Sequence, residues 1–158
     1  MKYSNNYMYS KDIDWFFSIN NQFIHVASAG GLLPKQINDR DELRNIQKKV
    51  FELPYIHNQE EIELNQPFLI KRFNNNINGI NNYLTSFVEM AMKGFISMDR
   101  TNLENLNDNR YHIVCMPKKL KPIEGLEEIF KIEHNEQISY SSIATDIDLL
   151  NLFKITKQ

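Results

Sequence analysis

The most informative segment of the chain is residues 80–98, INNYLTSFVEMAMKGFISM. Its large apolar residues recur every three or four positions, which is the spacing of one face of an α-helix. They are Ile80, Leu84, Phe87, Val88, Ala91, Phe95 and Met98. Glu89 and Lys93 are four residues apart, as in a favourable ion pair along a helix. Because other apolar residues lie around the rest of the circumference, the pattern predicts one long helix from Ile80 to Met98, packed on more than one side at the centre of the core.

The composition is that of a folded protein with enough apolar material for one core. The chain has 158 residues, of which 42% are hydrophobic and 11% aromatic, and we expect a single domain over residues 1–158. The formal net charge of −2 argues against binding to nucleic acid or to an anionic membrane surface. No signal peptide and no bilayer-length apolar segment is recognised, and the single cysteine fits a reducing compartment. We therefore expect a cytoplasmic protein.

Two elements are predicted on the N-terminal side of this segment. Residues 15–19 and 23–27 are aromatic and β-branched runs joined by Asn20-Asn21-Gln22, a pattern typical of a β-hairpin. Residues 39–53 combine a capping residue, either Asn38 or Asp39, with apolar positions on one helical face. Pro54 ends this amphipathic helix.

The remaining segments are predicted from shorter patterns. We expect a short helix at residues 60–64, a short element at 68–73, a loop at 74–82 and a strand at 111–116. Strands are expected at 127–133 and 138–140, although a helix fits that part of the pattern almost equally well. A helix is expected at 142–154, capped by Ser141 or Ser142. The whole is interpreted as α+β: a small, mainly antiparallel sheet of the N-terminal hairpin and C-terminal strands, packed against the long central helix and the amphipathic helix.

His25 is the first candidate functional residue. It lies in the second strand of the hairpin, three residues before Ser28, and Gly30-Gly31 follow. A histidine here can move a proton or hold a ligand hydroxyl, and the backbone N–H groups of the two glycines can bind an anion. The alternative is a core-edge histidine that is hydrogen-bonded to a neighbour, followed by an ordinary loop.

Part of this region resembles a known enzyme family. Residues 23–28, FIHVAS, followed by Leu32-Leu33-Pro34, resemble the opening strand of ADP-ribosyltransferase-like enzymes of the histidine-bearing kind. In that family a strand histidine followed by a small hydroxyl residue contacts the nicotinamide dinucleotide. The resemblance covers about a dozen residues, and Gly30-Gly31 depart from it. Glu133 and Glu136 lie in the part of the chain where the family has its later glutamate.

A second candidate cluster is Ser97, Asp99, Arg100, Tyr111 and His112. The predicted loop between the long helix and the next strand can bring a charged pair near an imidazole. Arginine suits bidentate recognition of phosphate or carboxylate, and His112 can serve as acid or base. The alternative is a helix end with its usual cation, followed by a strand whose residues alternate between faces.

These residues give two function hypotheses of different classes. The catalytic candidates are His25, Ser28, Arg100 and His112, and the ligand-binding candidates are Gly30, Gly31 and Tyr111. They would serve a small transferase of the ADP-ribosyltransferase-like type, or a hydrolase, with its site at the hairpin edge. Cys115 lies among apolar residues that keep a thiol inert, and the four histidines lack metal-ligand spacing, so no metal and no cofactor are expected.

The leading hypothesis is a non-enzymatic binding module of bacterial or bacteriophage origin. No nucleotide-binding loop or catalytic triad is visible, whereas Tyr3, Tyr7 and Tyr9 near the N-terminus are of a residue type enriched at protein interfaces. The expected partner is another protein or a second copy of the chain, with no nucleic acid and no membrane.

Overall fold

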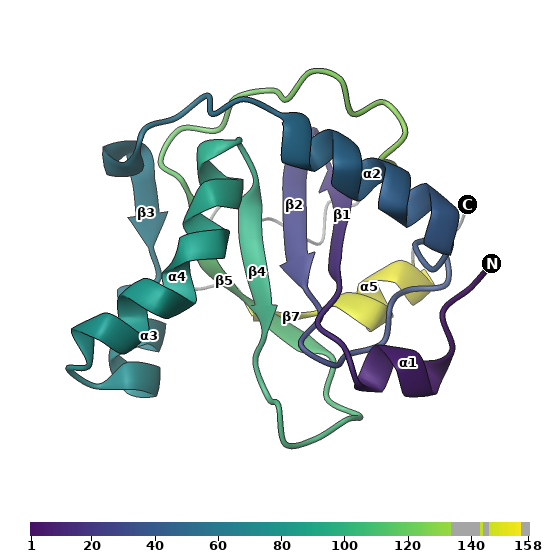
Figure 1. Ribbon diagram of the computed structural model, residues 1–158, viewed down its shortest axis with the longest axis horizontal. Helices are drawn as coiled ribbons and strands as arrows, with labels where there is room; N and C mark the ends of the chain where they lie inside the picture. The colour runs from purple at the N-terminus through teal and green to yellow at the C-terminus, as the bar shows by residue number, and fades with distance from the viewer. Residues whose placement is uncertain (134–142, 144–145, 156–158) are drawn as a thin grey trace.

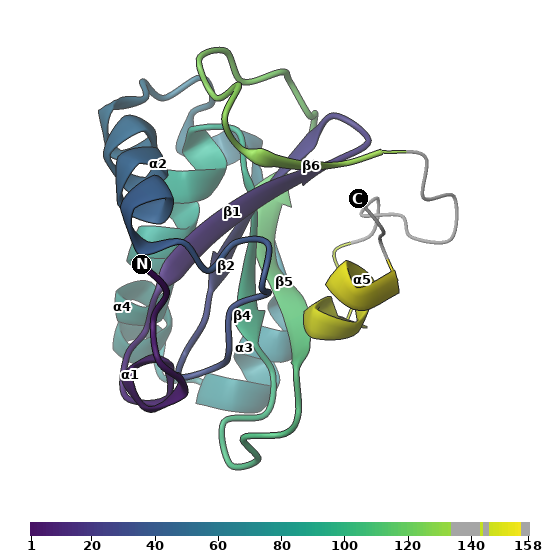
Figure 2. The same ribbon diagram turned by 90° about the vertical axis from the view of Figure 1, so that its right-hand side faces the viewer.

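The protein has an α+β fold in which helices lie on both faces of a sheet (Figure 1). The structure, a computed structural model, describes residues 1–133, 143 and 146–155. Helices α2 (Arg40–Glu52) and α4 (Ile77–Met92) cover one face, with α3 (Gln66–Phe73) beside α4, and α5 (Leu149–Ile155) covers the other (Figure 2). The short helix α1 (Asn5–Tyr9) packs near one end of the sheet. The predicted fold class is confirmed.

The sheet is mixed, whereas the sequence predicted a mainly antiparallel one. Its described strands are β1 (Asp14–Ile19), β2 (Gln22–Ala27), β3 (Ile62–Leu64), β4 (Ile96–Arg100), β5 (Arg110–Pro117), β6 (Phe130–Ile132) and β7 (Asp146–Asp148). They run in the order β3-β5-β4-β2-β1-β6, and β7 also pairs with β5. The pairs β2–β4 and β1–β6 are parallel, and the other pairs are antiparallel.

The N-terminal hairpin is confirmed, and its turn explains its register. Asn20 and Asn21 have φ angles of 48° and 65°, the left-handed conformation that asparagine tolerates and that a two-residue hairpin turn requires. The turn pairs Ile19 with Gln22 and therefore Phe16 with His25. Side chains alternate along β1, so Asp14, Phe16 and Ser18 lie on the side of the sheet that α2 and α4 cover, while the residues between them face α5.

The predicted amphipathic helix is confirmed as α2. The Asp39 side chain accepts hydrogen bonds from the backbone N–H groups of Asp41 and Glu42, so it caps the N-terminus as expected. Leu43 and Val50 are buried on the face that packs against the sheet. The helix ends before Pro54.

The predicted helix from Ile80 to Met98 is wrong in its last third. Helix α4 ends at Met92, and Gly94 has a φ of +109°, a conformation that glycine adopts without strain and that ends a helix. A side chain at Gly94 would also meet Ile123 at 2.9 Å. After this turn, β4 inserts between β2 and β5. Met98 therefore belongs to β4 and Phe95 to the connection before it, and neither is part of the helix that their spacing predicted.

Smaller elements also differ from the predictions. Residues 59–61 form a 3₁₀ turn that leads into β3, residues 66–73 form α3, and α4 begins at Ile77 within the predicted asparagine-rich loop, where the Asn76 side chain caps it. The predicted C-terminal helix at 142–154 is confirmed only in its second half, as α5, and Asp146–Asp148 form β7 instead. The predicted strand at 138–140 and the caps Ser141 and Ser142 lie outside the described residues.

Candidate functional site

A chain of hydrogen bonds passes through His25 from the buried strand β4 to the protein surface. Ser97 Oγ lies 2.6 Å from His25 Nδ1, and His25 Nε2 lies 2.9 Å from Asp14 Oδ1. Because a carboxylate can only accept, Nε2 carries a hydrogen and donates it to Asp14. In the neutral imidazole, Nδ1 then accepts a hydrogen bond from the Ser97 hydroxyl. The chain therefore fixes the orientation of the Asp14 carboxylate.

Ser97, His25 and Asp14 are the residue types of a catalytic Ser-His-Asp triad, but here the aspartate is exposed and the serine is buried. In a triad the serine hydroxyl must reach the substrate, and the aspartate lies behind the histidine. Here Ser97 is fully buried, His25 is 2% exposed and the Asp14 side chain is 54% exposed. Ser97 is therefore unable to act as a nucleophile in this conformation. The group presented to solvent is the carboxylate.

The sheet register places these three side chains together. Asp14 and His25 lie on the α4 side of the hairpin, two positions apart along the antiparallel ladder. Ser97 is opposite His25 in the parallel pair of β2 with β4. The rings of Phe16 and Phe87 pack against the imidazole at centroid distances of 5.4 and 6.1 Å. These packed rings leave the histidine little freedom to rotate.

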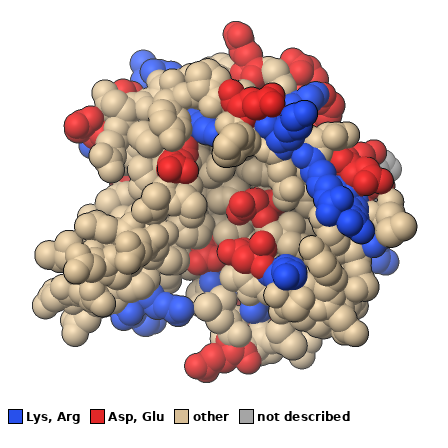
Figure 3. Space-filling model, viewed as in Figure 1, with Lys and Arg blue, Asp and Glu red and all other residues tan. Residues whose placement is uncertain are grey.

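Asp14 opens onto a cavity of about 450 Å³ between α1, α2 and α4. We call this the aromatic cavity, and its lining residues are Tyr3, Tyr7, Lys11, Asp12, Ile13, Asp14, Phe16, Arg44, Gln47, Phe51 and Met90. Acidic side chains gather in the hollow at the centre of this face (Figure 3). Sequence reasoning missed Asp14, although the hairpin register would have placed it beside His25. It missed the role of Ser97 because it assigned that residue to a helix.

Two aromatic side chains at the rim of the cavity are unusually exposed. Phe51 at the end of α2 is 81% exposed, and Tyr7 in α1 is 43% exposed. The Tyr7 ring stacks on Tyr3 with a centroid distance of 5.0 Å, and Lys11 Nζ lies 6.0 Å from the Tyr7 centroid. The predicted tyrosines Tyr3 and Tyr7 therefore line one cavity together with an exposed phenylalanine that the sequence did not single out.

Most of the other candidate residues form a buried cluster around the turn after β2. Ser28 Oγ accepts a hydrogen bond from the Ile13 N–H at 2.7 Å, and the Tyr111 hydroxyl donates to the Ser28 carbonyl at 3.4 Å. Arg100 Nε donates to the Ala29 carbonyl at 3.2 Å. All of these side chains are buried. Their contacts hold the turn in place against β4 and β5.

The two glycines complete this cluster. Gly30 has a φ of +80°, and a side chain at Gly31 would lie 2.5 Å from the Tyr111 hydroxyl. The N–H of Gly30 donates to the Lys11 carbonyl and that of Gly31 to the Ser28 carbonyl. Both groups are thus engaged within the protein, and the glycines serve close packing.

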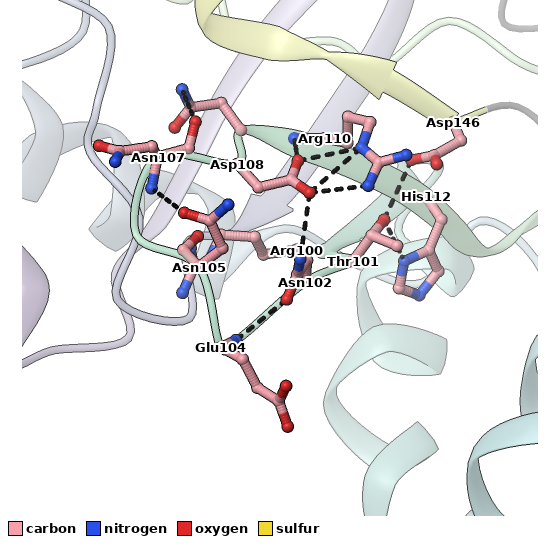
Figure 4. Close-up of polar contacts among 11 residues, drawn as sticks. Arg100, Thr101, Asn102, Glu104, Asn105, Asn107, Asp108, Arg110, His112 and Asp146 are labelled. Atoms are coloured by element: carbon pink, nitrogen blue, oxygen red, sulfur yellow. Dashed lines mark hydrogen bonds and ion pairs between the residues drawn. The ribbon is translucent and has the colours of Figure 1, made fainter.

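His112 lies on the same face of the sheet as His25 but has different neighbours. Figure 4 shows it beside Thr101 and Asp146. Its Nδ1 is 3.0 Å from Thr101 Oγ1, which in turn donates to Asp146 Oδ1 at 3.0 Å. The Phe68 ring packs on the imidazole with a centroid distance of 3.9 Å. The other ring nitrogen of His112, Nε2, is buried and has no hydrogen-bond partner among the described residues. Burial lowers the pKa of His112 to about 4.

Asp99, the cross-strand neighbour of His112, is also perturbed. Burial raises its pKa to about 6, although the Tyr83 hydroxyl donates a hydrogen bond to Oδ2 at 2.6 Å and opposes that shift. Burial and the Asp99 charge both raise the pKa of Tyr83. Cys115 is fully buried as expected, and burial raises its pKa to about 12. Titratable groups with shifted pKa values occur both at functional sites and in structural networks, so these shifts alone do not mark a functional site.

Neither the described side chains nor comparison with other proteins identifies a cofactor or a family. In the described part of the chain, no three His, Cys, Asp or Glu side chains are grouped as metal ligands. None of the described helices has both the length and the hydropathy for a bilayer crossing. No protein family, curated protein or solved structure gives a significant match. Of the glutamates that the enzyme resemblance would use, Glu136 lies outside the described residues.

Proposed function

We propose that the protein is a non-enzymatic binding module that acts in the cytoplasm and docks a segment of another protein, or of a second copy, in the aromatic cavity. The observation that supports this most strongly is Phe51. This large apolar side chain is 81% exposed at the rim of a cavity that Tyr7 also lines. Aromatic residues, methionine and arginine are the types enriched at protein interfaces, and all of them line this cavity.

Burial of Phe51 by a partner would supply a substantial part of the binding free energy. A phenylalanine side chain contributes on the order of 150 Å² of apolar surface, and burial is worth about 25 cal/mol per Å². Covering the exposed part of Phe51 is therefore worth about 3 kcal/mol. This is the size of contribution that alanine scanning finds for a dominant interface residue.

The transferase or hydrolase alternative has less support from the geometry. His25 and Ser28 hydrogen-bond to different partners, and the hydroxyl beside His25 belongs to the buried Ser97. Arg100 and Tyr111 are buried in the cluster behind the turn. These residues do not converge on the aromatic cavity. Of Ser97, His25 and Asp14, which form the hydrogen-bond chain, Asp14 alone lines that cavity.

Selection from a random peptide library displayed on phage tests the proposed function. Peptides enriched on the wild-type protein are synthesised, and their affinities are measured by fluorescence anisotropy. We expect Phe51→Ala to weaken binding by about 100-fold, following the 3 kcal/mol above, and Tyr7→Ala to weaken it by about tenfold. Ile77→Ala serves as the matched control, because Ile77 is 69% exposed but lies at the start of α4, outside the cavity lining.

Two outcomes would contradict the proposal. One is a set of selected peptides that bind Phe51→Ala as tightly as the wild type. The other is loss of binding in Ile77→Ala alone. Sedimentation velocity of the wild type and Phe51→Ala identifies a second copy as the partner if only the wild type associates.

A further inference from the structure

The chemistry of the aromatic cavity also indicates which side chain of the partner it binds. We propose that the cavity takes the guanidinium group of an arginine side chain, held by the Asp14 carboxylate and stacked on the aromatic wall. This inference rests on the proposed function, because the arginine belongs to the docked protein segment.

The Asp14 carboxylate is prepared for a cation before any partner binds. His25 holds Oδ1, the Ser97 hydroxyl holds His25, and both supporting side chains are buried. The Gln47 side chain donates to the Asp14 carbonyl at 2.8 Å, which also fixes the backbone at this position. Among the described residues, Oδ2 has no hydrogen-bond partner. A carboxylate held in this way loses little conformational entropy when it accepts a charged donor.

A second carboxylate lies in the same cavity two residues away. Asp12 Oδ1 accepts a hydrogen bond from the Ala29 N–H at 2.8 Å, so this side chain is also held by the fold. In the described part of the chain, no ion pair joins either carboxylate to a lysine or an arginine. A guanidinium group has five N–H donors in one plane and can use more than one acceptor oxygen.

The aromatic wall distinguishes arginine from other cations. The Lys11 ammonium lies over the Tyr7 ring at 6.0 Å, so this ring already takes a positive charge from the chain itself. An arginine guanidinium must displace Lys11 from the ring before it can stack there. The Tyr7 ring is itself fixed by stacking on Tyr3. A planar guanidinium can stack on such a ring and still donate to a carboxylate at its edge, whereas an ammonium group cannot stack.

Arg44 makes the sign of the charge effect testable. It lies on α2, lines the same cavity and is exposed. Its positive charge opposes the entry of another cation, although water and salt screen the effect. If the occupant is arginine, Arg44→Gln strengthens binding. An anionic occupant would bind Arg44→Gln more weakly.

The experiment is an NMR titration of the ¹⁵N-labelled full chain with two peptides. One is the N-acetylated, C-amidated peptide Ser-Gly-Arg-Gly-Ser, and the other has citrulline in place of arginine, which keeps the shape and removes the charge. We expect the arginine peptide to shift the backbone resonances of Tyr7 and Asp14 and to bind about tenfold more tightly than the citrulline peptide.

Variants connect the binding to the proposed residues. Asp14→Asn, which preserves an acceptor for His25, reduces the affinity for the arginine peptide by about tenfold and leaves that for the citrulline peptide unchanged. Ser97→Ala gives a smaller loss in the same direction, because it only loosens His25. The control Glu104→Gln removes one negative charge from the β4–β5 loop, outside the cavity, and leaves both affinities unchanged.

Equal affinity for the two peptides, no effect of Asp14→Asn, or no shift of the cavity resonances would overturn the inference. The proposed function would stand in each of these cases if Phe51→Ala still abolished binding of the library peptides. Conversely, Asp14→Asn could weaken binding of the arginine peptide while the library peptides bind Phe51→Ala as tightly as the wild type. That result would support the cation site and contradict the docking module.

Discussion

Replacing Lys93 by methionine is expected to destabilise the protein by about 2–3 kcal/mol. Lys93 directly follows α4 and caps its C-terminus, yet its side chain is buried and reaches the C-terminus of α2. Its ammonium group donates to the carbonyl groups of Val50 and Phe51 at 3.0 and 2.9 Å and lies 5.6 Å from the Phe51 ring. One side chain therefore joins the ends of two helices.

The magnitude follows from what these contacts replace. Each hydrogen bond from a charged donor is worth about 1.5–3 kcal/mol, and a cation at a helix C-terminus adds about 0.3–1 kcal/mol. Desolvation of the ammonium group offsets part of this sum. The Val50 carbonyl keeps its bond from the Leu53 N–H after the substitution, so one carbonyl loses its partner. Methionine preserves most of the side-chain volume, which limits any cavity effect.

Urea unfolding at neutral pH measures this effect through the fluorescence of Trp15, which is fully buried. With a denaturant slope of about 2 kcal/mol per M, we expect the midpoint of Lys93→Met to fall by about 1 M with the slope unchanged. Lys119→Met is the matched control, because Lys119 is exposed; we expect it to stay within about 0.5 kcal/mol of the wild type. A Lys93→Met variant as stable as Lys119→Met would refute the role of Lys93 at the end of α2.

Three further predictions concern the buried polar groups. Gly31→Ala is expected to cost more than about 2 kcal/mol in thermal unfolding, because its Cβ would lie 2.5 Å from the Tyr111 hydroxyl; addition of Tyr111→Phe should restore part of the loss, and an unchanged double variant would argue against this clash. The pKa of Asp99 is about 6 in the folded protein against an ordinary 3.8. Its contribution to the free energy of unfolding is therefore fully present below pH 3.8 and is lost as the pH rises through about 6. The pKa of His112 is lowered from 6.5 to about 4 in the folded protein. Its contribution to the free energy of unfolding is therefore fully present above pH 6.5 and is lost as the pH falls through about 4. Denaturation between about pH 7 and pH 4 should therefore show a steeper loss of stability on acidification in Asp99→Asn and a shallower one in His112→Phe, whereas parallel curves would contradict these assignments. The Cys115 thiol, whose pKa burial raises to about 12, should react with a disulfide reagent only after unfolding, and rapid reaction of the native protein would show that the strand is accessible.

Sequence patterns predicted the elements whose signals are local. The asparagine pair at residues 20 and 21 marks the hairpin turn, and Asp39 marks the start of α2, because each side chain acts on backbone within three residues of itself. The same reasoning failed at Gly94. Apolar residues on both sides of this glycine continue the helical spacing. The close approach of Ile123 to Gly94, which leaves no room for a side chain, is a contact between distant parts of the chain that the spacing does not reveal.

Because the helix end at Gly94 was missed, part of the candidate site was missed as well. Once residues 96–98 were assigned to a helix, nothing placed Ser97 beside His25. Phe51 gave no signal, because an exposed apolar residue on a helix has no local signature. His25 was found as a single residue with a suitable chemistry. The predicted hairpin also held the information that places Asp14 on the same face, but the prediction did not use it.

By itself the sequence determined the fold class, the hairpin and α2, since turn and capping residues act on their immediate neighbours. Only the tertiary structure decided that β4 pairs with β2, which brings Ser97 to a histidine 72 positions earlier in the chain. It also decided that residues of α1, α2 and α4 line the same open cavity as Asp14. The physical reason is that strand partners and cavity walls are selected by the burial of the whole core, a sum over distant residues that no short segment encodes.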